Sequence, residues 1–275
     1  MSAAAPTPTL TPTPRTPSRH TASRRTQLAL ARLALVLLLL ALWEAGHRAL
    51  GTTYIAGPLE VATRLAQVVV SGEVWPHLGA TLLASSLGFA IGWLLGFALP
   101  VLLGFSPRAS RALEPYVLLA MGIPLFALIP LLILWFGIGI TPKVVIVVFM
   151  VFFIVFITTF AGLRGIDRRW LDMGLVMGAT RWQQTMMISR HAMVPHLLAG
   201  LKIAVPRAIS AAIVGEFLVA DKGVGYYIEH ARQTADPVGV FAGIALVMVL
   251  VLAADLLLGR LQHRALRWQQ GTNIL

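Results

Sequence analysis

The apolar residues of this chain gather in six long runs instead of alternating with polar residues. Each run can cross a hydrocarbon core of roughly 30 Å, because an α-helix rises about 1.5 Å per residue. Backbone polar groups in lipid must bond within the segment, so we predict that the runs are helices. The pattern predicts an all-α, polytopic membrane protein with six transmembrane helices, at Leu28–Ala45, His77–Gly104, Leu113–Ile138, Lys143–Leu163, His196–Ala220 and Val238–Leu258.

The composition supports this class. Of the 275 residues, 57% are hydrophobic and only 12% are charged, whereas about 25% of a soluble domain is charged. A net charge of +11 would suggest nucleic-acid binding in a soluble protein, but here membrane topology explains it and we expect no nucleic-acid partner. The chain contains no cysteine, which excludes disulfides, thiolate catalysis and thiolate metal sites.

The positive charges predict the orientation of the helices. Of the 22 Lys and Arg residues, fifteen lie in the segments on one side of the membrane in this topology and five lie on the other. The remaining two, Lys202 and Arg207, lie inside the fifth run. Because Lys and Arg are enriched in cytoplasmic segments, we predict that both termini are cytosolic.

Two segments near the N-terminus lie outside the apolar runs. Residues 1–27 are rich in Pro, Thr, Ser and Ala, and we predict a disordered cytosolic tail because they cannot bury enough apolar surface to fold. Pro58–Val70 is predicted to be a short helix on the outer surface, with an i,i+4 ion pair between Glu60 and Arg64. Its apolar face is predicted to contain Ala62, Leu65, Ala66 and Val69.

The loop between the fourth and fifth runs, Arg164 to Pro195, has the strongest local signals. Asp167 is placed to cap a helix that starts at the next residue, and Gly174 and Gly178 then lower helix propensity. Thr180 and Gln183 have the spacing of a capping box, which predicts a second helix. The loop is therefore predicted to be a helix, a turn and a helix, with Trp170 and Trp182 available as aromatic anchors for a partner.

This loop resembles the signature loop of bacterial ABC importer permeases. The resemblance rests on Asp172-Met173-Gly174, with Gly178-Ala179 six residues after the aspartate and Ile188 ten residues after Gly178. The family pattern begins Glu-Ala-Ala, so Met173-Gly174 depart from it, as do Arg190-His191 where Leu-Pro is usual.

Other segments strengthen the resemblance to permeases for sulfonates, taurine, nitrate and related solutes. Together the similar segments extend from about Pro58 to Trp268. They include Pro124–Gly137, Gly200–Lys202, Gly215-Glu216, Gly223–Gly225 and Trp268. The resemblance implies a transmembrane permease domain over residues 28–275, with the type I importer core at about 73–262.

The family resemblance implies a function and a set of partners. The chain would form the translocation path for a small solute, resembling a sulfonate, nitrate or vitamin precursor, in the bacterial inner membrane. It would work with an ABC ATPase subunit, an extracytoplasmic solute-binding protein and a second permease copy in a homodimer. Membrane lipid would surround the spans. ATP would bind to the ATPase, and no cofactor is expected in this chain. The cytosolic coupling helix between the fourth and fifth spans would contact the ATPase through Asp172, Gly174, Gly178, Ala179, Thr180 and Trp182.

Prolines and ionisable residues inside the spans are candidates for lining the translocation path. Pro124 and Pro130 fall within the third run, where each kinks a helix, either at the path or as a packing feature. Arg207 and Glu216 are rare ionisable residues in a span, which face a cavity or a structural partner. Lys202 and Asp255 lie at similar depth, and we predict that they pair across the fifth and sixth spans.

The sequence argues against an enzyme and leaves one rival transporter class. It has no Gly-rich phosphate loop of the P-loop type, so this chain cannot hydrolyse ATP by that route. His191 and His196 lack a third ligand at metal-site spacing, and no metal is expected. The alternative is a secondary active transporter of a small solute, although no repeated halves with paired midplane carboxylates are visible.

Overall fold

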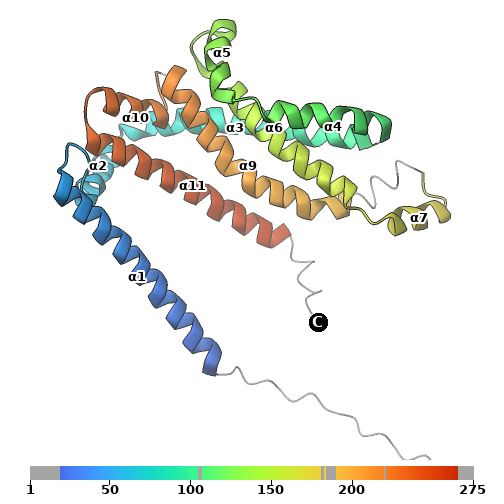
Figure 1. Ribbon diagram of the computed structural model, residues 1–275, viewed down its shortest axis with the longest axis horizontal. Coiled ribbons are helices and arrows are strands. Elements are labelled where there is room, and N and C mark those ends of the chain that lie inside the picture. The colour runs from blue at the N-terminus through green and yellow to red at the C-terminus, as the bar shows by residue number, and fades with distance from the viewer. Residues whose placement is uncertain (1–18, 105–106, 181–182, 184–189, 220, 266–275) are drawn as a thin grey trace, which may run out of the picture.

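The computed structural model describes residues 19–104, 107–180, 183, 190–219 and 221–265, and in these ranges all the regular structure is helical (Figure 1). The all-α prediction is confirmed. The elements are α1 Arg19–Leu50, α2 Pro58–Val70, α3 Val74–Gly104, α4 Pro107–Met121, the 3₁₀ turn η1 Leu125–Leu128, α5 Ile129–Phe136, α6 Ile140–Arg164, α7 Arg168–Val176, α9 Arg190–Val219, α10 Val224–Gln233 and α11 Pro237–Ala265.

Five helices in the described part of the chain are long and apolar enough to span a membrane. They contain Gln27–Leu50, Val74–Leu103, Ile140–Arg164, Met193–Leu218 and Pro237–Arg260. A sixth span exists if Pro115–Met121 and Leu125–Phe136 are taken together, but these two helical pieces meet at a bend of 80°. The predicted third span is therefore broken.

Proline and glycine explain where this span breaks. Pro124 precedes η1 in an extended conformation, with φ −69° and ψ 100°, after α4 has ended at Met121. Pro130 was predicted to kink a helix, and this is wrong, because it lies in the first turn of α5. There the missing N–H has no helical acceptor in any case, so the proline fits without distortion.

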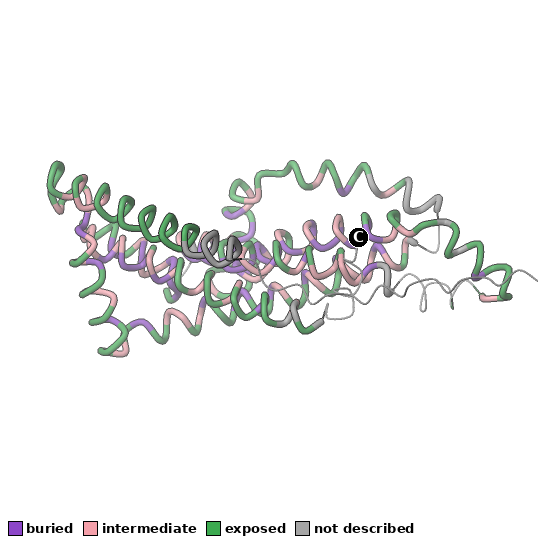
Figure 2. Tube along the Cα trace, turned by 90° about the horizontal axis from the view of Figure 1, so that it is seen from below, coloured by how far each residue is buried: buried purple, intermediate pink, exposed green. Residues whose placement is uncertain are grey.

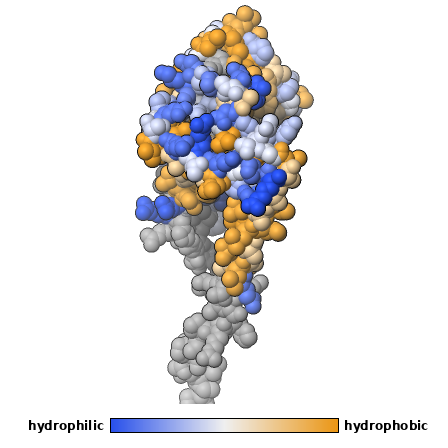
Figure 3. All heavy atoms as spheres, turned by 90° about the vertical axis from the view of Figure 1, so that its left-hand side faces the viewer, coloured by the Kyte–Doolittle hydropathy of each residue, from blue (hydrophilic) through white to orange (hydrophobic). Residues whose placement is uncertain are grey.

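The two predicted loops lie at opposite ends of the bundle. The short helices α2 and α10 lie together at one end, here named the α10 end, and α7 projects from the other, named the α7 end (Figure 1). Viewed from the α10 end, hydrophilic atoms gather over the tip and hydrophobic atoms surround them (Figure 3). This distribution is typical of a helical bundle whose ends protrude from a lipid layer.

A stripe of glycines brings α3 and α6 close together. A methyl group added at Gly92 would lie 2.8 Å from the carbonyl oxygen of Val148 and 2.9 Å from the Cβ of Val151. Gly88 and Gly96, one turn to either side, would clash with α6 in the same way. Small residues at four-residue spacing let helix backbones approach closely in a membrane, where packing replaces the hydrophobic driving force.

Helix α9 packs on another side of α6 and also uses glycine. A methyl group at Gly200 would overlap the side chain of Thr158, and one at Gly215 would lie 3.3 Å from Ile146. Between the two neighbours, Val147 and Val151 of α6 are fully buried. Buried residues accordingly concentrate along the inner helices (Figure 2).

Helix α1 diverges from this core (Figure 1) and is exposed along most of its described length. Its described contact with the rest lies near Trp43, whose indole N–H donates to the carbonyl oxygen of Ala56 at 2.9 Å. The Trp43 ring also stacks against Phe241 of α11. The helix begins at Arg19, so the last nine residues of the predicted 1–27 tail are helical.

The bounds predicted for α2 are confirmed, but its contacts are not those predicted. The Glu60 carboxylate accepts a hydrogen bond from the Gly57 N–H at 3.0 Å, while Arg64 pairs with Asp236 at the start of α11. The buried side chains are Val61 and Val68, which lie on a stripe next to the one predicted. The distant carboxylate at Asp236 explains why Arg64 turns toward the bundle.

The glycine contact between α3 and α6 makes a testable prediction. We expect Gly92→Ala to destabilise the purified protein by about 1–3 kcal/mol, because the methyl group overpacks against the α6 backbone. The measurement is thermal unfolding followed by size-exclusion chromatography in detergent. Gly79→Ala is the matched control in the same helix, since a methyl group there has no atom within 4 Å. Equal loss in both variants would contradict the close packing.

Candidate functional site

The segment at the α7 end is shaped by two local hydrogen-bonding motifs. The Asp167 carboxylate caps α7 by accepting from the Arg169 N–H at 3.0 Å, as predicted. At the other end, Gly178 has φ +79°, and its N–H donates to the carbonyl oxygen of Leu175. The Ala179 N–H donates to that of Gly174, which completes a Schellman motif. Gly178 therefore ends α7 through a conformation that side chains disfavour.

The predicted capping box is also present. The Thr180 N–H donates to the Gln183 side-chain oxygen at 2.8 Å, and the Gln183 N–H donates to the Thr180 hydroxyl at 3.3 Å. The turn predicted between Gly178 and Thr180 is therefore confirmed at the level of its hydrogen bonds. Trp182 and Ile188, named from the sequence, lie outside the described residues.

Helix α7 exposes apolar side chains outside the membrane spans. Trp170 and Leu175 are each 57% exposed, and Val176 is 88% exposed. Asp172 and Thr180 are exposed beside them, whereas Gly174 is buried. Figure 1 shows α7 projecting away from the bundle. A cluster of exposed apolar groups on a projecting element is typical of a protein-binding surface.

Helix α9 carries positive charge on an exposed arc inside the membrane. Lys202, Arg207 and Ser210 are all exposed, and Arg207 lies 14 residues after Met193 and 11 before Leu218, the ends of the span. At about 1.5 Å per residue, it is therefore near the middle of the hydrocarbon core. A Lys or Arg at this depth costs about 2.5–3.5 kcal/mol if it faces lipid.

The predicted pairing of Lys202 with Asp255 is wrong. Among the described residues, no ion pair joins these two side chains. The prediction matched their depth along two helices, but depth contains no information on how each helix is rotated. The structure leaves Lys202 exposed and Asp255 half-buried.

Glu216 near the other end of α9 is enclosed by polar partners. It is 1% exposed, and its carboxylate accepts from the Gly225 N–H in the first turn of α10 at 2.9 Å. The Thr81 hydroxyl of α3 lies 2.9 Å from both carboxylate oxygens and accepts from the Val224 N–H. A carboxylate at a helix N-terminus is stabilised by the unpaired N–H groups and the helix dipole. Glu216 therefore joins three helices at the α10 end.

Two further contacts close the bundle around Glu216. The Gly223 N–H donates to His77 Nδ1 at 3.2 Å, and the buried Lys143 ammonium donates to the Lys222 carbonyl oxygen at 3.2 Å. A side chain at Gly223 would overlap the Glu216 carboxylate. The sequence indicated Gly223 and Glu216 but not Thr81 or His77, because one hydroxyl or imidazole in an apolar run gives no local signal of its distant partner.

A polar cavity of about 380 Å³ opens at the α10 end, beyond this closure. Burial would raise the pKa of the Asp236 carboxyl, but hydrogen bonds from the Gly239 N–H and Arg64, with the Arg64 charge, lower it below its ordinary value. The wall of the cavity therefore contains the Arg64–Asp236 ion pair together with tyrosine and histidine rings. Its lining includes Arg64, Glu73, His77, Tyr226, His230 and Asp236.

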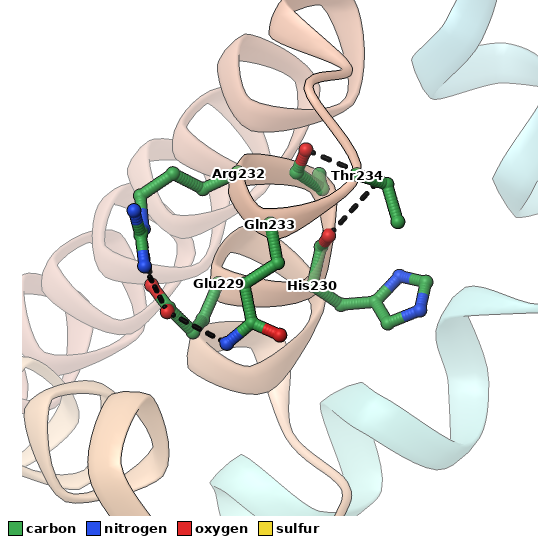
Figure 4. A network of polar contacts seen from close by, with 6 residues as sticks. Glu229, His230, Arg232, Gln233 and Thr234 are labelled. Carbon is green, nitrogen blue, oxygen red and sulfur yellow. Dashed lines mark hydrogen bonds and ion pairs between the residues drawn. The ribbon is translucent and has the colours of Figure 1, made fainter.

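The exposed face of α10 beside the cavity has its own polar network (Figure 4). Arg232 and Gln233 both donate to the Glu229 carboxylate, and the hydrogen bond from Arg232 is the main reason that the pKa of Glu229 falls to about 2. The Thr234 hydroxyl donates to the His230 carbonyl oxygen. These bonds fix the surface of α10 around the cavity.

Comparison with known proteins identifies the family. Residues 88–267 match the model of the binding-protein-dependent transport system inner membrane component. The chain belongs to this family. The match extends over most of the chain and includes α7, the Gly178 turn, the α9 arc and α10.

The relatives of this permease are transport proteins of similar length. It is 33% identical to the formylaminopyrimidine transport permease protein ThiX of Halalkalibacterium halodurans, over 84% of this chain and 93% of that one. It is 35% identical to the riboflavin transport system permease protein RibX of Chloroflexus aurantiacus, over 84% and 87%. It is 29% identical to the putative aliphatic sulfonates permease SsuC of Bacillus subtilis, over 84% of each chain.

A solved structure shares the fold of this permease. A chain of the inward-facing MetNI methionine ABC transporter matches with a TM-score of 0.55 and 20% identity, over 68% of this chain and 92% of that one. With the family match, this shows an ABC transporter permease, a multi-pass protein of the bacterial inner membrane.

The Glu216 contacts make a second testable prediction. We expect Glu216→Ala to destabilise the permease by about 1–3 kcal/mol, because the Thr81 hydroxyl and the Gly225 N–H lose a buried partner. Thermal unfolding in detergent is the measurement. Glu229→Ala, which removes an ion pair on the α10 surface, is the control and should leave the midpoint unchanged. If the two variants behave alike, Glu216 does not fasten the α10 end.

Proposed function

We propose that this permease forms the translocation path of an ATP-driven importer and that α7, with the turn at Gly178, is its coupling helix. The observation that carries the proposal is the cluster of exposed apolar side chains on α7, outside the spans. A separate ATPase subunit would cover this cluster. Asp172, Gly174, Ala179, Thr180 and Trp182 would belong to the same contact.

The geometry of the turn supports this role. A side chain at Gly178 would meet no atom within 4 Å, so the backbone there is open to a partner. The segment directly follows α6 and leads to α9, the two helices that pack closely in the core. A force applied to α7 would therefore act on both. ATP binding by the partner can move the permease only if the nucleotide favours one of its conformations.

The α10 end and the α9 arc supply the other surfaces that an importer needs. The hydrophilic tip around the 380 Å³ cavity would receive the extracytoplasmic solute-binding protein that the family description implies. The exposed arc of α9 would face a second permease copy across the path, with Arg207 lining it. Pro124 would form a hinge beside this path. Glu216, with its carboxylate enclosed, would fasten the outer end of the same helix.

The names of the relatives set the range of solutes. They refer to formylaminopyrimidine, riboflavin and aliphatic sulfonates, all small solutes. We propose a small solute in this range for the present permease. A secondary active transporter is the second candidate, and it would move solute without ATP.

Photo-cross-linking tests the ATPase contact. With p-benzoylphenylalanine at Met177, which is 79% exposed, irradiation of cells of the native host should attach a subunit that contains a P-loop ATPase sequence. Mass spectrometry of the purified adduct identifies it. The control is the same probe at Val70, 87% exposed at the opposite end. The proposal would be contradicted if no ATPase is cross-linked to Met177, or if the ATPase is cross-linked equally to Val70.

A pair of glycine variants separates partner contact from backbone strain. Gly178 and Gly51 have φ of +79° and +80°, and a Cβ atom added at either has no atom within 4 Å. A left-handed residue costs roughly 1–2 kcal/mol, which corresponds to a factor of about 5–30. We expect Gly178→Val to lower ATPase co-purification by such a factor and Gly51→Val to leave it unchanged. Equal co-purification in the two variants would exclude Gly178 from the contact.

A further inference from the structure

Two cations on α9 have no counter-charge among the residues that the structure describes. Lys202 and Arg207 are both exposed within the span Met193–Leu218. In the part of the chain that the structure describes, neither has an ion-pair or hydrogen-bond partner for its side chain. Unpaired charges at membrane depth face a water-filled cavity or the interior of a bundle, because lipid cannot solvate them.

The carboxylates that the structure describes in the spans are already engaged or are not paired with these cations. Glu44 is paired with Arg48 on α1, and the Glu216 carboxylate is enclosed by Thr81 and the first turn of α10. Asp255 forms no ion pair with Lys202. The arc therefore presents a net positive charge to whatever lies in front of it.

The backbone of α9 adds polar groups to the same arc. Pro206 has no N–H, so the carbonyl oxygen of Lys202, four residues earlier, loses its helical donor. The Ser210 hydroxyl, one turn after Pro206, donates to the Pro206 carbonyl oxygen at 3.1 Å. The freed carbonyl group and the two cations indicate water in front of this arc, since backbone polar groups are left free at membrane depth only beside a cavity or protein.

We infer that this arc selects for a small anionic solute and that Arg207 is its main contact. The inference rests on the proposed function, because it places the solute path along α9. A guanidinium group binds planar or tetrahedral oxoanions through two parallel hydrogen bonds, which favours a sulfonate or a carboxylate. Lys202 lies about 7.5 Å along the helix and about 140° around it, since each residue adds about 1.5 Å and 100°, so it adds positive charge only at the edge of the arc. An uncharged solute could accept hydrogen bonds from these groups, but it would lack the charge attraction that strengthens them.

The absence of cysteine from the chain allows a direct measurement of this charge. Ser210→Cys, one turn from Arg207, is placed in the assembled transporter in vesicles of its native membrane. It is then treated with two thiol reagents of similar size, the anionic sulfonatoethyl and the cationic trimethylammonioethyl methanethiosulfonate. We expect the anionic reagent to react roughly tenfold faster, relative to its rate with Leu59→Cys at the α10 end.

Charge-removing variants test the residues that we assign. Adding Arg207→Gln to Ser210→Cys should reduce this preference several-fold, whereas adding Arg207→Lys should preserve most of it. Met248→Cys, exposed on the middle of α11, is the control for a lipid-facing site and should react with neither reagent. Labelling of Leu59→Cys in the Arg207→Gln background shows that the variant is folded and inserted.

Three results would overturn the inference. Ser210→Cys could fail to react with either reagent, which would mean that no water reaches the arc. It could react equally with both, or Arg207→Gln could leave the preference unchanged. These outcomes are independent of cross-linking at Met177, so loss of the anion selectivity and loss of the ATPase contact can be told apart.

Discussion

The backbone contact between α3 and α6 at Gly88, Gly92 and Gly96 is the constraint on which the rest of this structure depends. Between lipid-embedded helices there is no water to expel, so association relies on close packing and on backbone proximity. Glycine at every fourth position provides this proximity. Because α9 packs on α6 by the same means, α6 lies at the centre of the packed helices. The segments that join the two ends of α6 are therefore held in fixed positions.

The two ends of the bundle use polar groups in opposite ways. At the α10 end, Glu216, Thr81 and the first turn of α10 satisfy one another inside the protein and hold three helices together. On α7 and the turn that follows it, the hydrogen bonds that the structure describes are local ones, and apolar side chains of α7 remain exposed. One end is thus internally complete, while the other has a surface that a partner would complete.

Local signals in the sequence predicted local structure well. The bounds of α2, the Asp167 cap and the Thr180–Gln183 box were all readable, because each depends on residues within one turn. Contacts between side chains far apart in the sequence could not be predicted. Arg64 pairs with a carboxylate 172 residues away instead of its neighbour Glu60. The rotation of a helix about its axis decides whether Lys202 meets Asp255, and an apolar run does not reveal this rotation. The close packing of α3 on α6 was not predicted, because the spacing of glycines in one helix does not tell which helix lies opposite.

The break in the third span has a consequence for biosynthesis. Neither Pro115–Met121 nor Leu125–Phe136 is long enough to cross the hydrocarbon core alone, and they meet at 80°. During translation the insertion machinery would therefore receive two short apolar pieces in place of one continuous segment. The packing of this region is completed only when α6 emerges from the ribosome and adds Phe153 and Phe156 to the cluster around Val117. The order of synthesis and the order of assembly are in this way linked.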